Sequence, residues 1–287
     1  MPDSLRPAFS LPAPFDGWFA ARGWQARPHQ MALTEAALAG ESALLIAPTG
    51  GGKTLAGFLA SLIELKDKAR QSNTGIPALH TLYISPLKAL AVDVQRNLMA
   101  PVSDMDLPIR IETRTGDTPS HVRQRQRRTP PDVLLTTPEQ LALFIASDHA
   151  KEFFADLKCV IIDEVHAMAA SKRGDLLSLG LSTLAGWAPA CRFVGLSATV
   201  KEPEELARWL APDARIIRAE GGVSAEVDIL VSRERIPWSG HSGRFAVPEV
   251  YEAIKAAKMA LVFVNTRSQA EVMFQELWRA NEDSLSI

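Results

Sequence analysis

A glycine-rich segment, residues 47–54, carries the residue types that hold a chain of phosphates. It reads Ala-Pro-Thr-Gly-Gly-Gly-Lys-Thr and departs from the pattern G-x-x-x-x-G-K-[ST] at its first position, where Ala47 stands. Its glycines let backbone N–H groups turn toward phosphate oxygens. Lys53 is expected to reach the β- and γ-phosphates, and Thr54 to ligate Mg²⁺. The predicted nucleotide-binding residues here are Thr49, Gly50, Gly51, Gly52, Lys53 and Thr54.

A pair of carboxylates follows a second apolar run, at Asp163-Glu164. At the end of a strand, Asp163 can hold Mg²⁺ through water, while Glu164 can take a proton from an attacking water. The alternative is a helix start that favours acidic residues. Because the pair follows a phosphate loop in the same chain, we favour catalysis and predict Lys53, Asp163 and Glu164 as the catalytic residues.

Short apolar runs alternate with helical stretches and predict the elements that position these residues. The expected strands are 43–47, 79–85, 109–112, 132–136, 158–163 and 192–197. They are too short and too apolar for a sheet with one solvent-exposed face. We therefore predict a doubly wound, mostly parallel α/β sheet. Helices are expected at about 28–39, ended by Gly40, and at 55–65. Further helix starts are predicted at Ser85-Pro86, at a capping box on Thr137 and at a box formed by Ser268 and Glu271.

The composition divides the chain into three parts. Residues 1–220 hold all the strands above and form one predicted domain. Residues 221–248 form an expected linker with one extended segment, 225–231. Residues 249–287 begin a further unit, with a helix at 249–257, a strand at 259–264 and a helix at 268–280. One strand and two helices cannot build a core by themselves.

Charge and cysteine content exclude several classes of protein. The 287 residues contain 31 Lys+Arg and 33 Asp+Glu, for a net charge of −2. Any nucleic-acid site must therefore be a local patch. Two cysteines cannot form a disulfide framework or a four-cysteine metal site. No apolar run reaches the roughly 18 residues of a membrane span, so no membrane partner is expected.

A run of arginines without acids, Arg123, Arg125, Arg127 and Arg128, is the strongest local charge. Its members would share helix faces. We favour a solvated helix face over a strand contact, because no aromatic residues interleave to stack on bases.

The phosphate loop together with Asp-Glu-Val-His at 163–166 resembles the superfamily 2 DExH-box helicases. Further segments resemble that family's motifs in its own order: SPLKAL (85–90), TRTGDT (113–118), TTPEQL (136–141), SAT (197–199) and LVFVNTR (261–267). The flanking stretches 15–30 and 243–254 most resemble the large helicase-related (Lhr) group, in particular the bacterial ligase-associated DNA helicases.

The resemblance implies a RecA-like fold of the P-loop NTPase type, with a complete first lobe and the start of a second. It implies ATP and Mg²⁺ as cofactors, with Gln30 reading the adenine edge. We expect the tryptophans at 18, 24, 187 and 209 to be core residues, with one exception left open: an aromatic residue or Arg27 packing on the adenine. His166, Ser197 and Thr199 would couple the nucleotide to the strand. The implied nucleic-acid contacts, which position a backbone without reading bases, are Ser85, Pro86, Lys88, Thr113, Arg114, Thr115, Gly116, Thr136, Thr137, Asn265, Thr266 and Arg267.

The function implied is an ATP-dependent helicase or translocase on single-stranded or tailed DNA, moving 3′ to 5′ in repair in the bacterial cytoplasm at the nucleoid. RNA–DNA hybrids and a DNA ligase or nuclease are further implied partners. Two alternatives stay open: an RNA helicase, and a nucleotide-dependent binding lobe without catalysis. The family's motifs V and VI are absent from these residues. We therefore expect an N-terminal fragment that binds ATP and hydrolyses it slowly.

Overall fold

The computed structural model describes residues 9–66, 78–198, 200–219, 227–231 and 243–281. It contains two compact units, residues 1–222 and residues 223–287, which we describe separately. Within the described ranges, none of the helices is both long and apolar enough to cross a membrane.

Unit 1 is built on a seven-stranded sheet in which every pairing is parallel, with the order β3-β4-β2-β5-β6-β1-β7. Parallel neighbours need crossover connections, and helices supply them here. The strands are β1 (Ala43–Ile46), β2 (Thr81–Ile84), β3 (Ile111–Arg114), β4 (Val133–Thr136), β5 (Cys159–Ile162), β6 (Arg192–Ser197) and β7 (Arg215–Arg218).

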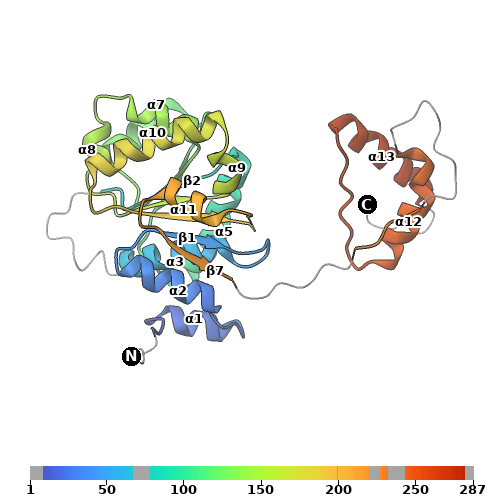
Figure 1. Cartoon of the computed structure of the whole chain (residues 1–287), viewed down its shortest axis with the longest axis horizontal. Helices are drawn as coiled ribbons and strands as arrows, with labels where there is room; N and C mark the ends of the chain where they lie inside the picture. Colours follow the sequence, from blue (N-terminus) through green and yellow to red (C-terminus); the bar gives the residue numbers. More distant parts are fainter. Residues whose placement is uncertain (1–8, 67–77, 199, 220–226, 232–242, 282–287) are drawn as a thin grey trace. The chain divides into compact units, whose positions relative to one another are not determined.

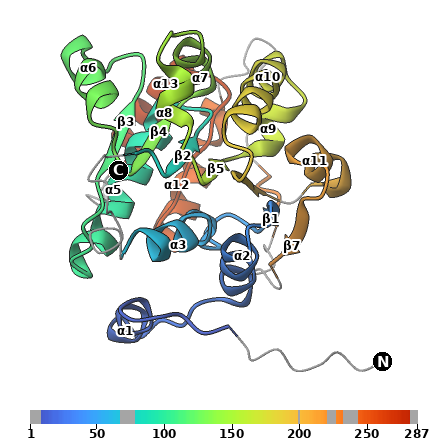
Figure 2. The same cartoon turned by 90° about the vertical axis from the view of Figure 1, so that its left-hand side faces the viewer.

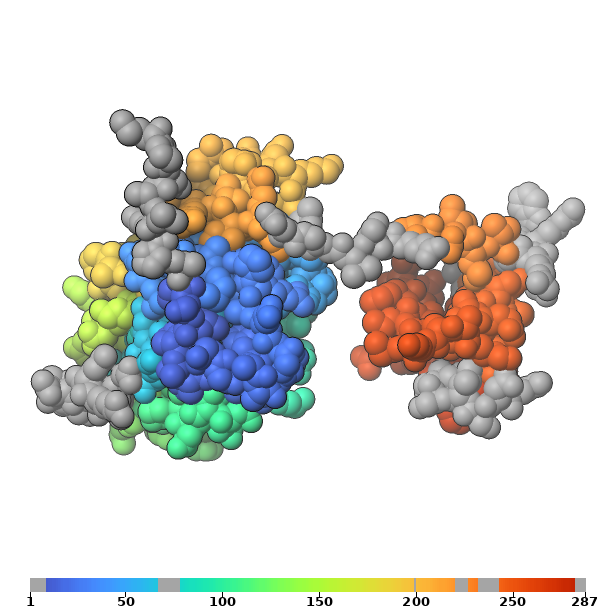
Figure 3. Space-filling model, turned by 90° about the horizontal axis from the view of Figure 1, so that it is seen from below, coloured from blue at the N-terminus to red at the C-terminus, as the bar shows by residue number. Residues whose placement is uncertain are grey.

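Helices cover both faces of this sheet, as Figures 1 and 2 show. One face packs on α1 (Phe15–Ala21), α2 (Pro28–Leu38), α3 (Lys53–Leu65) and α5 (Lys88–Asp104). The other packs on α7 (Pro138–Ile145), α8 (Ala150–Phe154), α9 (Val165–Ala169), α10 (Lys172–Trp187) and α11 (Pro203–Leu210). The arginine run lies on α6 (Ser120–Arg128). The blue N-terminal segment, with α1 and α2, covers much of the face of unit 1 seen in Figure 3.

Burial on both faces explains why the strands read as unbroken apolar runs. Along β1, Ala43 and Leu45 belong to one core cluster and Leu44 and Ile46 to the other. All four are buried. The doubly wound parallel sheet predicted from the sequence is therefore confirmed, and its hydrophobic core divides into two layers.

Each of the six predicted strands is present, with two differences at the sheet edges. The segment predicted at 109–112 forms its strand two residues later, as β3. The edge strand β7 was not predicted, because its sequence Arg-Ile-Ile-Arg offers only two apolar residues. It forms because β1 provides a neighbour, with Ala43 opposite Arg215.

Two predicted helix starts were wrong in detail. Ser85 does not cap a helix, since α5 begins at Lys88 with Leu87 at the N-cap. Thr137 does precede Pro138 at the start of α7, but its side chain accepts no capping hydrogen bond. Gly40 follows α2 with a φ of 81°, and its N–H donates to the Ala37 carbonyl, as expected of a helix end.

Unit 2 contains a 3₁₀ turn (Arg244–Ala246) and two helices, α12 (Val247–Ala256) and α13 (Arg267–Ala280). Val247, Tyr251, Met273 and Leu277 form a small core between the helices. The predicted strand at 259–264 is not formed, because no strand of the described residues pairs with it. The cap of α13 is Thr266, whose hydroxyl accepts from the Gln269 N–H, and not Ser268.

The extended segment predicted at 225–231 is only partly described. Residues 227–231 form no strand and are exposed, whereas 225 and 226 lie outside the described residues.

Candidate functional site

The strand order sorts the sequence motifs into two neighbouring groups along one edge of the sheet. Strands β1, β6 and β5 are adjacent, and their carboxyl ends lead into the phosphate loop, Ser197 and Asp163. Strands β2, β4 and β3 continue the sheet, and their ends lead into segments 85–90, 136–141 and 113–118. Ligands of open parallel sheets bind at these carboxyl ends. The fold therefore places the predicted nucleotide residues beside the predicted strand contacts.

The phosphate loop has the backbone that its glycines allow. Gly50 and Gly52 both adopt a φ of 75°, in the left-handed region. A Cβ on Gly52 would lie 2.7 Å from Nε2 of Gln30, so the Gln30 amide would have to leave its place on the loop. The Lys53 ammonium is buried and donates to the Ala47 carbonyl at 3.0 Å. Its charge is thus held inside the loop.

Three side chains from the start of α2 contact successive loop carbonyls. Arg27 Nη1 donates to the Gly50 carbonyl at 3.2 Å, and Gln30 Nε2 donates to that of Gly52 at 3.2 Å. His29 Nε2 lies 2.8 Å from the Gly51 carbonyl. Because that carbonyl can only accept, the ring carries its proton on Nε2. The sequence does not reveal this contact of His29, because a histidine without a ligand-like partner nearby carries no signal of a role.

Gln30 is buried and uses both ends of its amide, since its Oε1 also accepts from the Arg27 N–H at 2.9 Å. Its role at the adenine edge, and that of Arg27 on the base, remain predictions. In this structure both residues donate hydrogen bonds to backbone carbonyls of the phosphate loop.

Asp163 is fixed in orientation by two donors. The buried Tyr83 hydroxyl on β2 donates to one carboxylate oxygen at 2.5 Å, and the Glu164 N–H donates to the other at 2.9 Å. Burial and the nearby Asp163 charge raise the pKa of Tyr83, so the phenol keeps its proton and remains a donor. Sequence reasoning missed Tyr83, because a tyrosine inside an apolar strand carries no catalytic signal.

The loop and the carboxylates line one cavity of about 600 Å³. Its walls include Lys53, Thr54, Asp163 and Glu164, together with one face of α5. Among the described residues, no cluster of three or more His, Cys, Asp or Glu could hold a metal ion alone. The cavity does offer the Thr54 hydroxyl and the Asp163 carboxylate, which are oxygen ligands of the kind that Mg²⁺ takes together with the phosphates of its substrate.

Aromatic residues of the N-terminal segment form the far wall of this cavity. Trp18 is buried in the core, whereas Trp24 is 54% exposed. The Arg22 guanidinium lies over both rings, 4.3 Å from the Trp18 centroid and 5.9 Å from that of Trp24, and it also pairs with Asp104. The expectation that the tryptophans are core residues holds for Trp18 and fails for Trp24.

The predicted coupling residues lie together where described. His166 Nδ1 is 3.1 Å from the Ser197 hydroxyl and 3.5 Å from a Glu164 carboxylate oxygen. This contact joins the carboxylate pair to the end of β6. Thr199, the third predicted coupling residue, lies outside the described residues.

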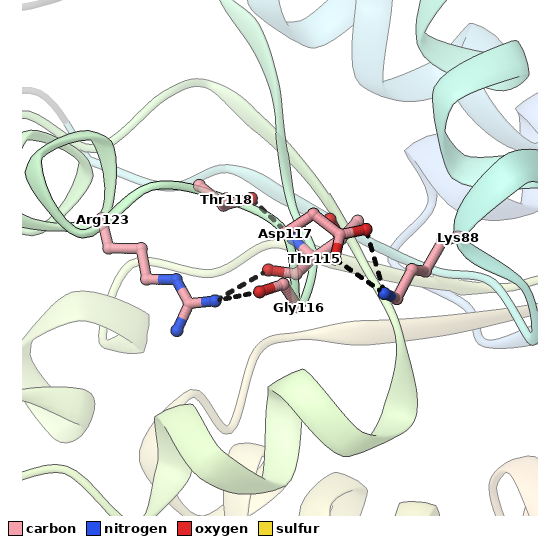
Figure 4. Close-up of polar contacts among 6 residues, drawn as sticks. All are labelled: Lys88, Thr115, Gly116, Asp117, Thr118 and Arg123. Atoms are coloured by element: carbon pink, nitrogen blue, oxygen red, sulfur yellow. Dashed lines mark hydrogen bonds and ion pairs between the residues drawn. The ribbon is translucent and has the colours of Figure 1, made fainter.

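Only part of the predicted strand-contact set faces outward. Lys88 and Gly116 are exposed, and Lys88 pairs with Asp117 (Figure 4). Pro86 and Thr113 are half-buried, whereas Ser85, Thr115 and Thr137 are buried. The accessible part of the set in unit 1 is therefore the Lys88 ammonium and the Gly116 backbone, and not these buried hydroxyls.

Arg114 and Thr136 direct their polar groups into the protein. The Arg114 guanidinium lies 3.9 Å from the Phe144 ring centroid, and the side chain is buried. Burial and the charges of Arg127 and Arg123 lower the pKa of Arg114 to about 10. The Thr136 hydroxyl donates to the Arg114 carbonyl at 2.7 Å. The guanidinium of Arg114 therefore lies against Phe144 in this structure, and its contact with a phosphate stays a prediction.

Arg173 on α10 is a second contact that the sequence did not reveal. Its Nε donates to a Glu139 carboxylate oxygen at 2.6 Å, and its Nη2 donates to the Pro86 carbonyl at 2.8 Å. It thereby connects segments 85–90 and 136–141 to the helices that follow the carboxylate pair. The next residue must be glycine, because a Cβ on Gly174 would lie 2.2 Å from the Met168 carbonyl.

The arginine run does not act as one surface. Arg123 donates to the Thr115 and Gly116 carbonyls, and Arg125 pairs with Glu112. Arg127 and Arg128 are exposed, as expected of a solvated face, and line a separate cavity of about 500 Å³.

The predicted contacts Asn265, Thr266 and Arg267 belong to unit 2. Thr266 caps α13, and the Arg267 side chain is 93% exposed. Their contact with a strand remains a prediction.

Comparison with known proteins is consistent with this geometry. The family model described as DEAD/DEAH box helicase matches residues 27–206. The chain is 40% identical over 276 residues to a protein of Mycolicibacterium smegmatis named Lhr helicase/probable uracil glycosylase, covering 91% of the chain and 18% of the relative. It is 34% identical to the ATP-dependent helicase Lhr-Core of Sulfolobus acidocaldarius, covering 93% of the chain and 32% of the relative.

A solved structure of Mycobacterium smegmatis helicase Lhr bound to ssDNA and AMP-PNP matches with a TM-score of 0.77 and 35% identity, covering 95% of this chain and 36% of that one. The chain thus spans well under half the length of these relatives. The family match covers the phosphate loop, the carboxylate pair and the segments between them. The chain belongs to the DEAD/DEAH box helicase family.

Proposed function

We propose that this chain is the nucleotide-binding part of an ATP-dependent helicase that moves along single-stranded DNA. One observation carries the proposal: Lys53, Thr54, Asp163 and Glu164 line a single cavity at the carboxyl edge of the sheet. Their neighbours along that edge are the segments predicted to contact a nucleic-acid backbone. A translocase hydrolyses a nucleotide at one site and binds a nucleic-acid strand at a neighbouring site. The cavity residues and the predicted strand-contact segments have this arrangement.

The residues of the cavity divide the chemistry between them. Backbone N–H groups of the loop and the α3 N-terminus bind phosphates, and Lys53 exchanges the Ala47 carbonyl for a phosphate oxygen. Thr54 and Asp163 would hold Mg²⁺, which supplies charge neutralisation at the phosphates. Glu164 takes the proton of the attacking water, and Tyr83 keeps Asp163 in the orientation of an acceptor.

Two contacts offer a route from the nucleotide to the strand. Glu164, His166 and Ser197 connect the carboxylates to the end of β6. Arg173 connects α10 to the Pro86 carbonyl and to Glu139. The first contact begins at the carboxylate pair itself, and the second joins two of the predicted strand-contact segments to α10, so the two would act at different points of such a route.

We propose DNA as the strand, since a relative that shares 35% identity with this chain was solved with bound ssDNA. Movement from 3′ to 5′, a role in repair beside a DNA ligase or nuclease, and a place at the bacterial nucleoid rest on the resemblance of residues 15–30 and 243–254 to the Lhr group.

We also propose that these 287 residues bind ATP and hydrolyse it slowly by themselves. The cations that line the described cavity are Lys53 and Arg22, and Arg22 is engaged by Asp104 and two tryptophan rings. A guanidinium that meets the transferring phosphoryl group is worth about 10³–10⁵ in rate in such enzymes. Without such a guanidinium, the cavity is expected to bind ATP but to hydrolyse it slowly.

The test measures both properties. A fluorescent ATP analogue should bind in the presence of Mg²⁺, and Lys53→Ala should weaken that binding at least about tenfold. ATP hydrolysis should stay slow with and without single-stranded DNA. Nucleotide affinity unchanged in Lys53→Ala would contradict the nucleotide site, and brisk DNA-stimulated turnover lost in Lys53→Ala would contradict the slow-turnover proposal. Tighter binding of RNA than of DNA of the same sequence would favour an RNA helicase.

A further inference from the structure

The turn at residues 115–118 is held from two sides by contacts of different kinds (Figure 4). On the α6 side, Arg123 Nη2 donates to the Thr115 carbonyl at 3.0 Å and to the Gly116 carbonyl at 2.9 Å. Inside the turn, the Thr115 N–H donates to the Thr118 hydroxyl at 2.9 Å. On the α5 side, Lys88 Nζ lies 3.0 Å from each carboxylate oxygen of Asp117.

The contacts on the two sides of the turn differ in how easily another group can displace them. The side chains of Lys88 and Asp117 are 55% and 79% exposed, so water solvates both ions and their pairing is weak. The contacts of Arg123 and Thr118 are made to the backbone of the turn itself. The turn therefore keeps its shape when the Asp117 carboxylate moves away from Lys88.

A phosphodiester offers Lys88 the same chemistry as Asp117 does. Each presents two oxygens that share a negative charge to an ammonium. Lys88 Nζ would lie 3.3 Å from a Cβ on Gly116, so the ammonium is next to the exposed glycine backbone of the turn. A phosphate that approaches Gly116 thus meets an ammonium already occupied by a carboxylate.

We propose that Asp117 is an intramolecular competitor of the nucleic-acid backbone: it occupies Lys88 in the free protein and is displaced by a phosphodiester of the bound strand. This inference rests on the proposed function, because it needs a strand at this edge of the sheet. It makes Asp117 the residue that weakens strand binding here. A weaker contact lets the strand be released and bound again, as movement along it demands.

The test is Asp117→Asn in the 287-residue chain, with binding of a labelled single-stranded oligodeoxynucleotide followed by anisotropy between about 50 and 200 mM salt. The variant keeps the size of the side chain and removes its charge. We expect binding about 3–10-fold tighter at the lowest salt, and a plot of log K against log salt steeper by about one. Glu204→Gln is the matched control, because Glu204 is 64% exposed and pairs with Arg218 on another part of unit 1. It should bind within about twofold of the unaltered chain.

A double-mutant cycle with Lys88→Ala tests whether Asp117 acts through Lys88. In that background the gain from Asp117→Asn should fall to less than half, because no ammonium remains to compete for. An equal gain in both backgrounds would overturn the inference, as would unchanged or weaker binding by a folded Asp117→Asn chain. If the unaltered chain bound ATP but no strand at 50 mM salt, the proposed strand site itself would fail, and that result is distinct from the others.

Discussion

Two loops at the same edge of the sheet are held in place in very different ways. The phosphate loop is contacted by Arg27, His29 and Gln30, and the latter two are only 6% and 4% exposed. The turn at 115–118 is held by one half-buried arginine and by the Thr118 hydroxyl, and its remaining contact is an exposed ion pair. The difference indicates that the nucleotide loop is preformed, whereas the strand-contact turn can exchange a partner.

Gly52 faces Gln30 in the phosphate loop, and Gly116 faces Lys88 in the turn, so alanine at each position tests how rigid the two loops are. Gly52→Ala should have the largest effect, because its φ of 75° costs a side chain about 1–2 kcal/mol and its Cβ would lie 2.7 Å from Gln30 Nε2. Nucleotide affinity should fall at least about tenfold, measured by titration of a fluorescent ATP analogue.

Gly40→Ala separates backbone strain from the clash, since Gly40 has a φ of 81° but no neighbour within 4 Å of a new Cβ. It should lower the melting temperature without changing nucleotide affinity. Equal nucleotide binding by Gly52→Ala and the unaltered chain would mean that the loop is not preformed.

The next effect is expected for His29→Ala. Removing the ring leaves the buried Gly51 carbonyl without its 2.8 Å partner, which costs about 1–2 kcal/mol. Calorimetric titration with an ATP analogue should show affinity lower by about 5–30-fold. The exposed His149 provides the control, and its replacement by alanine should leave nucleotide binding unchanged. If replacing His29 changed nucleotide affinity as little as replacing His149, His29 would not be needed to hold the phosphate loop.

Arg123→Ala tests the turn in the same manner and should have a smaller effect. Because the guanidinium contacts two carbonyls near the surface, its loss should weaken single-strand binding by about 3–10-fold and leave nucleotide affinity unaltered. Arg125→Ala removes the same charge from the same helix but breaks only a pair with Glu112. Equal losses in both variants would show that α6 acts by charge alone.

Gly116→Ala should have the smallest effect. Unlike Gly52, this glycine has no left-handed φ, and its Cβ would meet only the flexible end of Lys88 at 3.3 Å. Strand affinity should change less than about threefold by anisotropy. If Gly116→Ala weakened strand binding by as large a factor as Gly52→Ala weakens nucleotide binding, the two loops would be equally rigid. The contrast between them would then be lost.

Much of unit 1 could be predicted because its signals are local. Apolar runs bounded by turn residues located β1, β2, β4, β5 and β6, and Gly-Gly-Gly-Lys-Thr between a strand and a helix identified the phosphate loop. The edge strand β7 carried too few apolar residues to be recognised. In unit 2 the apolar segment 259–264 has the composition of a strand, but without a described neighbour to accept its hydrogen bonds it does not form one.

The amino-acid sequence alone determined the residue types at the catalytic positions, the spacing of the loop and the carboxylates, and the parallel α/β class, since these depend on neighbours in the chain. Only the tertiary structure decided that Tyr83 orients Asp163, that His29 holds Gly51 and that Arg173 reaches Pro86. The partners in these pairs are 80, 22 and 87 residues apart. Their meeting depends on strand order and helix packing, which no local pattern encodes.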